Sequence, residues 1–169
     1  MTFSKLVDKA MHYAYNKHIG QFRKDGETPY ITHPAAVAQL LYESGVREQN
    51  TLSAAWLHDV VEDTNTTVQD IERQFGTKVA NLVDAVTRRE NEPREDYLNR
   101  LIKSGKSAIL IKISDAYHNL QTINCVPNKK QRMQQHNRLM YECKKYYLPI
   151  ARKICPAIYR KIKIELKIN

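Results

Sequence analysis

The chain has 169 residues, 42% hydrophobic and 27% charged, a balance that fits one folded domain and excludes a disordered or fibrous protein. No apolar run approaches the roughly 18 residues of a membrane-spanning helix, and Lys5, Asp8 and Lys9 interrupt the apolar core that a signal peptide would need. Three cysteines without a CxxC pair indicate reduced thiols, so we expect a cytoplasmic protein without membrane contact.

Helical start and stop signals occur early in the chain. Pro34 is expected to be the first helical residue of a segment that ends at Gly45, because its fixed φ and missing N–H suit that position. Thr66 and Gln69 have the spacing of a capping box for a second helix, which Gly76 closes.

The same periodicity continues through the middle of the chain. Apolar residues recur at helical spacing over 79–86 and again over 109–120. The run Ala108–Ile113 could pass for a strand by itself, but its continuation favours a helix. We therefore expect a single all-α domain over residues 1–169, a compact bundle of about eight to ten helices.

Positive charge is concentrated at the C-terminal end. The net charge of the chain is +9. Residues 129–169 contain 12 lysines and arginines against only Glu142 and Glu165, whereas the preceding residues are almost neutral. Such a segment attracts phosphate on a nucleotide, a nucleic acid or an anionic surface, although it is also compatible with the solvated outer face of terminal helices.

A cluster of histidine and carboxylates follows a strongly apolar run. His58 and Asp59 precede Glu62 and Asp63 by four residues, so on one helix each would lie beside its partner. Burying these groups is costly unless their charge is compensated, and a divalent cation bound by imidazole and carboxylate compensates it. The alternative is an exposed helix end with a solvated acidic run.

Further ligands would have to come from elsewhere in the chain. His33 precedes Pro34, a rigid position at which an imidazole can be held in place. Asp115 lies on a polar stripe of an otherwise apolar helix. Neither residue is identified as a ligand by its spacing alone.

Longer motifs connect these residues. The segment around His33 is GETPYITHP, the segment around His58 is AAWLHDVVEDTNTTVQDIERQFGTKVANLVDAVT, and the segment around Asp115 is ILIKISDAYHNLQT; YYLPIA follows near Tyr147. Together they resemble the hydrolase domain of the RelA/SpoT alarmone enzymes, which belongs to the HD phosphohydrolase superfamily. The length leaves no room for a synthetase domain, so we expect a stand-alone small alarmone hydrolase, similar to the metazoan SpoT homologues.

The resemblance implies a metal-dependent hydrolase. One divalent cation, usually manganese in this family, would be held by His33, His58, Asp59 and Asp115. Glu62 and Asp63 would be the catalytic pair, placed to take a proton from water or to orient it. The sequence does not distinguish their roles, and it leaves iron, cobalt and zinc open as alternatives to manganese.

The implied reaction removes the 3′-diphosphate of guanosine tetraphosphate or pentaphosphate, (p)ppGpp, giving pyrophosphate and GDP or GTP. Residues that match the substrate-binding positions of the family are Arg23, Lys24, Asn119 and Thr122. The chain departs from the family at Ala116 and Gln121, where arginines are usual. These two departures bear on base selectivity and affinity more than on metal binding.

Two alternatives therefore stay open. The chain could be an HD phosphohydrolase for another 3′- or 2′-phosphorylated substrate, such as an adenosine alarmone, NADPH or pyrophosphorylated tRNA. It could instead be a basic nucleic-acid-binding module with a structural metal, using the segment from about residue 129, which could also contact tRNA as part of a hydrolase. The sequence does not predict the oligomeric state.

Overall fold

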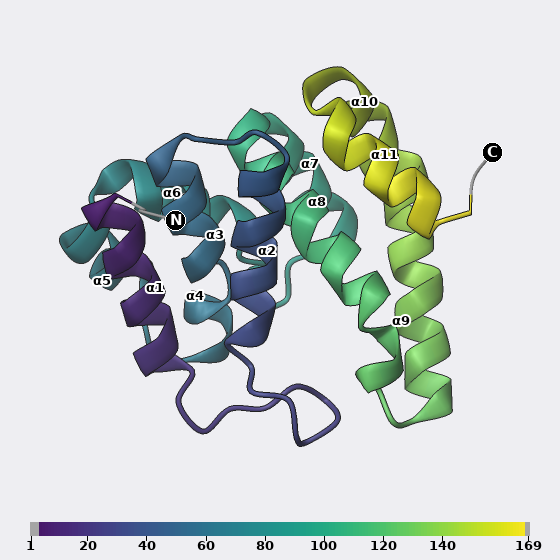
Figure 1. The fold of residues 1–169 in the computed structure, drawn as a ribbon, viewed down its shortest axis with the longest axis horizontal. Coiled ribbons are helices and arrows are strands. Elements are labelled where there is room, and N and C mark those ends of the chain that lie inside the picture. The colour runs from purple at the N-terminus through teal and green to yellow at the C-terminus, as the bar shows by residue number, and fades with distance from the viewer. Residues whose placement is uncertain (1–3, 168–169) are drawn as a thin grey trace.

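The computed structural model describes residues 4–167, which are mostly helical (Figure 1). In chain order, the α-helices of this region are α1 (Lys5–Lys17), α2 (Thr32–Glu43), α3 (Gln49–Leu57), α4 (Val60–Asp63), α5 (Val68–Phe75), α6 (Thr77–Val86), α7 (Arg94–Lys103), α8 (Lys106–Gln121), α9 (Lys129–Glu142), α10 (Leu148–Ile154) and α11 (Pro156–Glu165). A 3₁₀ turn, Ile123–Cys125, follows α8, and a π-helical segment, Cys143–Tyr147, joins α9 to α10.

The expected all-α class is confirmed. Nine of the α-helices in residues 4–167 have eight residues or more, and the short helices α4 and α10 bring the number to eleven. No β-strand forms within the same residues, and an isolated β-bridge pairs Phe22 with Pro29 in the long connection between α1 and α2. The run Ala108–Ile113 lies inside α8, as its helical continuation indicated.

Helices α2, α3 and α8 pack against one another and form the centre of the domain (Figure 1). Residues 51–57 of α3 are all buried, because α1, α2, α6 and α8 surround this helix. Ile109, Ile111, Ile113 and Leu120 of α8 belong to the same core. Burial of each side chain of this size contributes roughly 1.5–3 kcal/mol to the free energy of folding. The three helices therefore hold their polar groups in stable positions.

The basic C-terminal segment forms α9, the π-helical segment, α10 and α11. These elements pack on α8, on the side away from α1 and α5 (Figure 1). The expected free thiols are present: Cys143 and Cys155 are buried, and Cys125 is partly exposed. None of the helices in residues 4–167 is long and apolar enough to cross a lipid bilayer.

The expected capping box was wrong by one residue. Thr67, not Thr66, caps α5, and its hydroxyl accepts from the backbone N–H of Asp70, whose carboxylate accepts from the backbone N–H of Thr67. Thr66 is buried, and its hydroxyl accepts a hydrogen bond from the hydroxyl of Thr64. Thr66 and Gln69 therefore do not form the cap.

Two other local expectations also need correction. Pro34 is the third residue of α2 rather than the first, because the helix begins at Thr32; a proline is tolerated there because first-turn N–H groups have no partner within the helix. His58 and Asp59 form a turn between α3 and α4 rather than part of one helix. The N–H of Asp63 still donates to the carbonyl of Asp59, at 2.8 Å, so the helical spacing of this pair is kept.

The expected domain bounds, residues 1–169, reach beyond the part of the chain that the structure describes. Residues 1–3 and 168–169 lie outside it. The assignment of the whole chain to one domain therefore stays a prediction.

Candidate metal centre

Four side chains from separate places in the chain converge on one point. His33 is the second residue of α2, and Asp115 lies in the second half of α8. His58 and Asp59 occupy the turn between α3 and α4. The Nε2 atom of His33 lies 3.3 Å from Nε2 of His58 and 3.1 Å from Oδ1 of Asp115. The Oδ2 atom of Asp59 lies 3.5 Å from His33 Nε2 and 3.2 Å from His58 Nε2.

Hydrogen bonds on the far side of each imidazole set its orientation. The Nδ1 atom of His58 lies 2.8 Å from the carbonyl oxygen of Ala55. Because a carbonyl only accepts, Nδ1 carries the proton, and the neutral ring presents its Nε2 lone pair to the shared point. The Nδ1 atom of His33 lies 2.7 Å from Nδ1 of His118 on α8. Both buried rings therefore direct Nε2 toward Asp59, and Nε2 of His33 also contacts Asp115.

Positive charge compensates the buried carboxylates. Burial alone would raise the pKa of Asp115, but Lys112, whose Nζ lies 2.6 Å from Oδ2, and His33 together hold that pKa well below its usual range. Burial would also lower the pKa of His58, yet the neighbouring Asp59 carboxylate outweighs it and raises the pKa to about 9. The Asp59 carboxylate therefore favours the charged form of His58, and a cation at the shared point would take over this compensation.

This donor set fits a divalent cation. One ligand atom each from His33, His58 and Asp59 lies within 4.8 Å of the others, and Asp115 adds an oxygen next to His33. Two imidazoles and two carboxylates form a mixed nitrogen–oxygen set that suits manganese and other first-row metals. Because removing each carboxylate from water costs several kcal/mol, a cation at this point would offset a large penalty.

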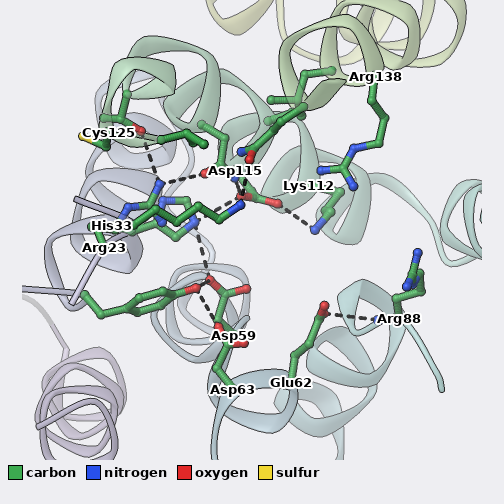
Figure 2. Close-up of a pocket in the computed structure, with 18 of the residues that line it drawn as sticks. Arg23, His33, Asp59, Glu62, Asp63, Arg88, Lys112, Asp115, Cys125 and Arg138 are labelled. Carbon is green, nitrogen blue, oxygen red and sulfur yellow. Dashed lines mark hydrogen bonds and ion pairs between the residues drawn. The ribbon is translucent and has the colours of Figure 1, made fainter. Parts of the chain in front are cut away.

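The predicted catalytic carboxylates lie next to this group. A tyrosine hydroxyl, that of Tyr30, lies 2.7 Å from Oδ2 of Asp59 and 2.6 Å from Oδ2 of Asp63, so the two carboxylates are side by side as their spacing predicted. Burial raises the pKa of Asp63. The carboxylate of Glu62 accepts from the backbone N–H of Arg88, at 3.5 Å (Figure 2).

The group opens onto a cavity of about 610 Å³. Figure 2 shows Arg23, His33 and Cys125 on one side of Asp115, and Lys112, Arg88 and Arg138 on the other. Cations that line the cavity are Arg23, Lys24, Arg88, Arg94, Lys112 and Arg138. The cavity thus presents positive charge on both sides of Asp115.

The four predicted substrate-binding residues all line this cavity. A guanidinium N–H of Arg23 donates to Oδ1 of Asn119, at 2.9 Å, and Arg23 also contacts the hydroxyl of Thr122 at 3.3 Å. The ammonium of Lys24 donates to the side chain of Gln135 on α9, at 2.8 Å. Their proximity is compatible with a shared binding role, which stays a prediction.

Sequence reasoning missed several residues of the cavity. Tyr30 was part of the quoted GETPYITHP segment, and its position three residues before His33 was the available signal. Lys112 precedes Asp115 by one helical turn, which could have indicated their ion pair. The bidentate pair between Arg94 and Glu142, with contacts of 2.8 and 2.7 Å, joins residues 48 apart and had no local signal.

The two departures from the family pattern have different consequences. Ala116 lines the cavity, so the small side chain stands where a larger cation is usual. Gln121 is exposed, is not among the residues that line the cavity, and donates to the hydroxyl of Tyr117 at 2.9 Å. Only the change at Ala116 therefore acts directly on the cavity.

The chain is similar to several known proteins. The HD domain family matches residues 10–154. The guanosine-3′,5′-bis(diphosphate) 3′-pyrophosphohydrolase MESH1 of Xenopus tropicalis is 39% identical over 140 residues, 78% of each chain. The bifunctional (p)ppGpp synthase/hydrolase SpoT of Escherichia coli (strain K12) is 38% identical over 160 residues, which cover 89% of this chain but 22% of that protein. A solved structure described as a metazoan orthologue of SpoT that hydrolyses ppGpp has a TM-score of 0.84 at 29% identity, covering 99% of this chain and 97% of the other.

Proposed function

The chain belongs to the HD-domain family, and on this premise we propose that it hydrolyses the 3′-diphosphate of guanosine tetraphosphate or pentaphosphate to give pyrophosphate and GDP or GTP. The observation that carries the proposal is the convergence of His33, His58, Asp59 and Asp115 at a cationic cavity. Relatives named for this reaction match over most of their length, and the solved ppGpp hydrolase has the same fold.

We propose that the site holds one divalent cation, Mn²⁺. Its ligands would be the Nε2 atoms of His33 and His58 and carboxylate oxygens of Asp59 and Asp115. When bound, it supplies Lewis-acid stabilisation of phosphoryl charge and makes water a better nucleophile. Lys112 forms an ion pair with Oδ2 of Asp115, while Oδ1 of the same carboxylate faces His33. Ala55 holds the proton of His58 on Nδ1.

Asp63 and Glu62 are the groups that we expect to accept or donate protons during hydrolysis. Burial raises the pKa of Asp63, which brings this carboxyl closer to the working range of a general base near neutral pH. The Tyr30 hydroxyl holds Asp63 beside Asp59, within reach of the candidate metal position. Glu62 lines the cavity from the same short helix, where it can orient water or substrate.

The cations of the cavity suit a nucleotide with phosphates at both the 3′ and the 5′ position of its ribose. Lys112 and Arg94 already form ion pairs with Asp115 and Glu142. Four lining cations have no carboxylate partner within residues 4–167, namely Arg23, Lys24, Arg88 and Arg138. Since Arg23 lies on one side of Asp115 and Arg88 and Arg138 lie on the other, these cations could neutralise phosphates on either side of the scissile bond.

Ala116 favours a second candidate substrate class. Its short side chain leaves the cavity wall without the cation that is usual in the family. An adenosine alarmone, NADPH or another 3′- or 2′-phosphorylated substrate, including pyrophosphorylated tRNA, therefore belongs on the substrate panel. We expect the basic surface of α9–α11 to contribute if the substrate is a tRNA, and binding should then weaken steeply with salt.

Hydrolysis of guanosine tetraphosphate tests the proposal directly. The purified chain with Mn²⁺ should release pyrophosphate and GDP, and Asp59→Asn, which keeps the side-chain volume but removes a charged ligand, should reduce release to background. Asp96→Asn, at an exposed position in the first turn of α7, is the matched control and should stay active. Absence of pyrophosphate release by the unmodified chain over a range of pH and metals contradicts the proposal.

We also propose a cytoplasmic location. The three cysteines are free thiols, including the partly exposed Cys125, which fits a reducing compartment. Fractionation of cells that produce the chain, followed by detection in the cytosolic fraction, tests this assignment.

A further inference from the structure

His118 contacts the candidate metal ligand His33 at the ring nitrogen that faces away from the metal position. Its Nδ1 atom lies 2.7 Å from Nδ1 of His33, and the two rings are 4.9 Å apart with an angle of 34° between their planes. His118 follows Asp115 by three residues on α8, so both point from the same face of the helix. Asp115 contacts Nε2 of His33 at 3.1 Å. One helix therefore contacts both nitrogens of this buried imidazole.

The close approach of two ring nitrogens requires a single shared proton. One Nδ1 must donate and the other must accept, because two N–H groups cannot face each other at 2.7 Å. A cation beside Asp59 and Asp115 needs the lone pair on Nε2 of His33, which places the proton of His33 on Nδ1. His118 must then be the acceptor, with its own proton on Nε2.

His58 provides an internal comparison. Its Nδ1 donates to the carbonyl of Ala55, an acceptor that cannot change its role. Within residues 4–167, the side chain of His33 contacts no backbone carbonyl, and its Nδ1 depends on the side chain of His118 instead. We propose that His118 is a positioning residue that holds His33 in the tautomer and orientation required for metal binding. This inference rests on the proposed function only in treating the four-residue group as a metal site.

The affinity of the full-length chain for Mn²⁺, measured by titration calorimetry without substrate, tests the inference. His118→Phe keeps an aromatic ring but removes the acceptor, and we expect about 10–100-fold weaker binding. His118→Asn places an amide oxygen near the position of Nδ1 and should restore most of the affinity. His12→Phe, on the exposed surface of α1, is the matched control and should bind Mn²⁺ like the unmodified chain.

A tautomer measurement separates positioning from packing. In the Zn²⁺-loaded chain, ¹⁵N NMR of the imidazoles should show the proton of His118 on Nε2 and that of His33 on Nδ1. A proton on Nδ1 of His118 overturns the inference, as does Mn²⁺ binding by both His118 variants within twofold of the unmodified chain. Failure of the unmodified chain to bind either metal also overturns it, whereas metal binding without ppGpp hydrolysis contradicts only the proposed reaction.

Discussion

Replacing Lys112 by methionine should lower the free energy of unfolding of the metal-free protein and raise its affinity for metal. The Nζ atom of Lys112 lies 2.6 Å from Oδ2 of Asp115, and the two side chains are only 14% and 8% exposed. Methionine keeps the apolar stem of the lysine but removes its charge. Asp115 would then remain buried beside Asp59, with less positive charge to compensate the two carboxylates.

The magnitude follows from the burial of this pair. Removing one partner of a buried ion pair costs about 3–5 kcal/mol. Because Asp115 keeps its contacts with His33 and the amide of Asn119, we expect the lower end of that range, a loss of about 3 kcal/mol. A bound cation would itself compensate Asp115 and reduce the loss to about 1 kcal/mol. The difference of about 2 kcal/mol corresponds to roughly 30-fold tighter metal binding by Lys112→Met.

Urea unfolding in EDTA and in saturating Mn²⁺ gives both free energies, and calorimetry gives the metal affinity independently. Lys145→Met is the matched control, because Lys145 lies 3.5 Å from Glu95 with both side chains largely exposed. It should change the free energy of unfolding by less than about 1 kcal/mol, equally with and without metal. A loss below about 1 kcal/mol for metal-free Lys112→Met, or weaker metal binding by this variant, refutes the reasoning.

Three further predictions concern two residues of the cavity and the ion pair between Glu92 and Arg100. Tyr30→Phe removes the hydroxyl that holds Asp63, so kcat for ppGpp should fall about tenfold with KM nearly unchanged; a change confined to KM in steady-state assays contradicts this. Ala116→Arg restores a cation to the wall, and competition assays should show a lower KM for guanosine tetraphosphate; an unchanged KM argues that this position does not contact substrate. Hydrogen bonds from Arg100 lower the pKa of Glu92 to about 2, so the stabilisation from this pair is present above about pH 4.5 and lost as the pH falls toward 2. Glu92→Gln should therefore lose about 1 kcal/mol of unfolding free energy at pH 7 and clearly less near pH 2, where part of Glu92 is protonated; an equal loss at both values contradicts the assignment.

Local sequence signals located the helices better than their ends. The pattern at 66–70 contains two overlapping capping boxes, one beginning at Thr66 and one at Thr67, and their spacing is the same. Burial of Thr66 against the rest of the fold decides between them, and burial is a tertiary property. The turn at His58 and Asp59 could not be predicted either, because no glycine or proline interrupts the apolar run there.

The candidate site divides into a local part and a long-range part. Asp59 and Asp63 are four residues apart, and helical spacing was sufficient to place them side by side. His33 and Asp115 are far apart in the chain, so only the family resemblance could connect them. Tyr30 was overlooked because its position before His33 does not reveal that its hydroxyl contacts Asp59 and Asp63, which come from another part of the chain.

The basic C-terminal segment shows why net charge is a weak guide to a binding site. Its 12 lysines and arginines predicted attraction of phosphate. Within residues 4–167, Arg138 alone among them lines the cavity, and the same wall carries Glu142, which holds Arg94 in a bidentate pair. The local balance of charge therefore depends on one arginine and one buried carboxylate. A sum over the segment cannot distinguish these from lysines on the outer helix faces, because fold and burial determine which charges a ligand meets.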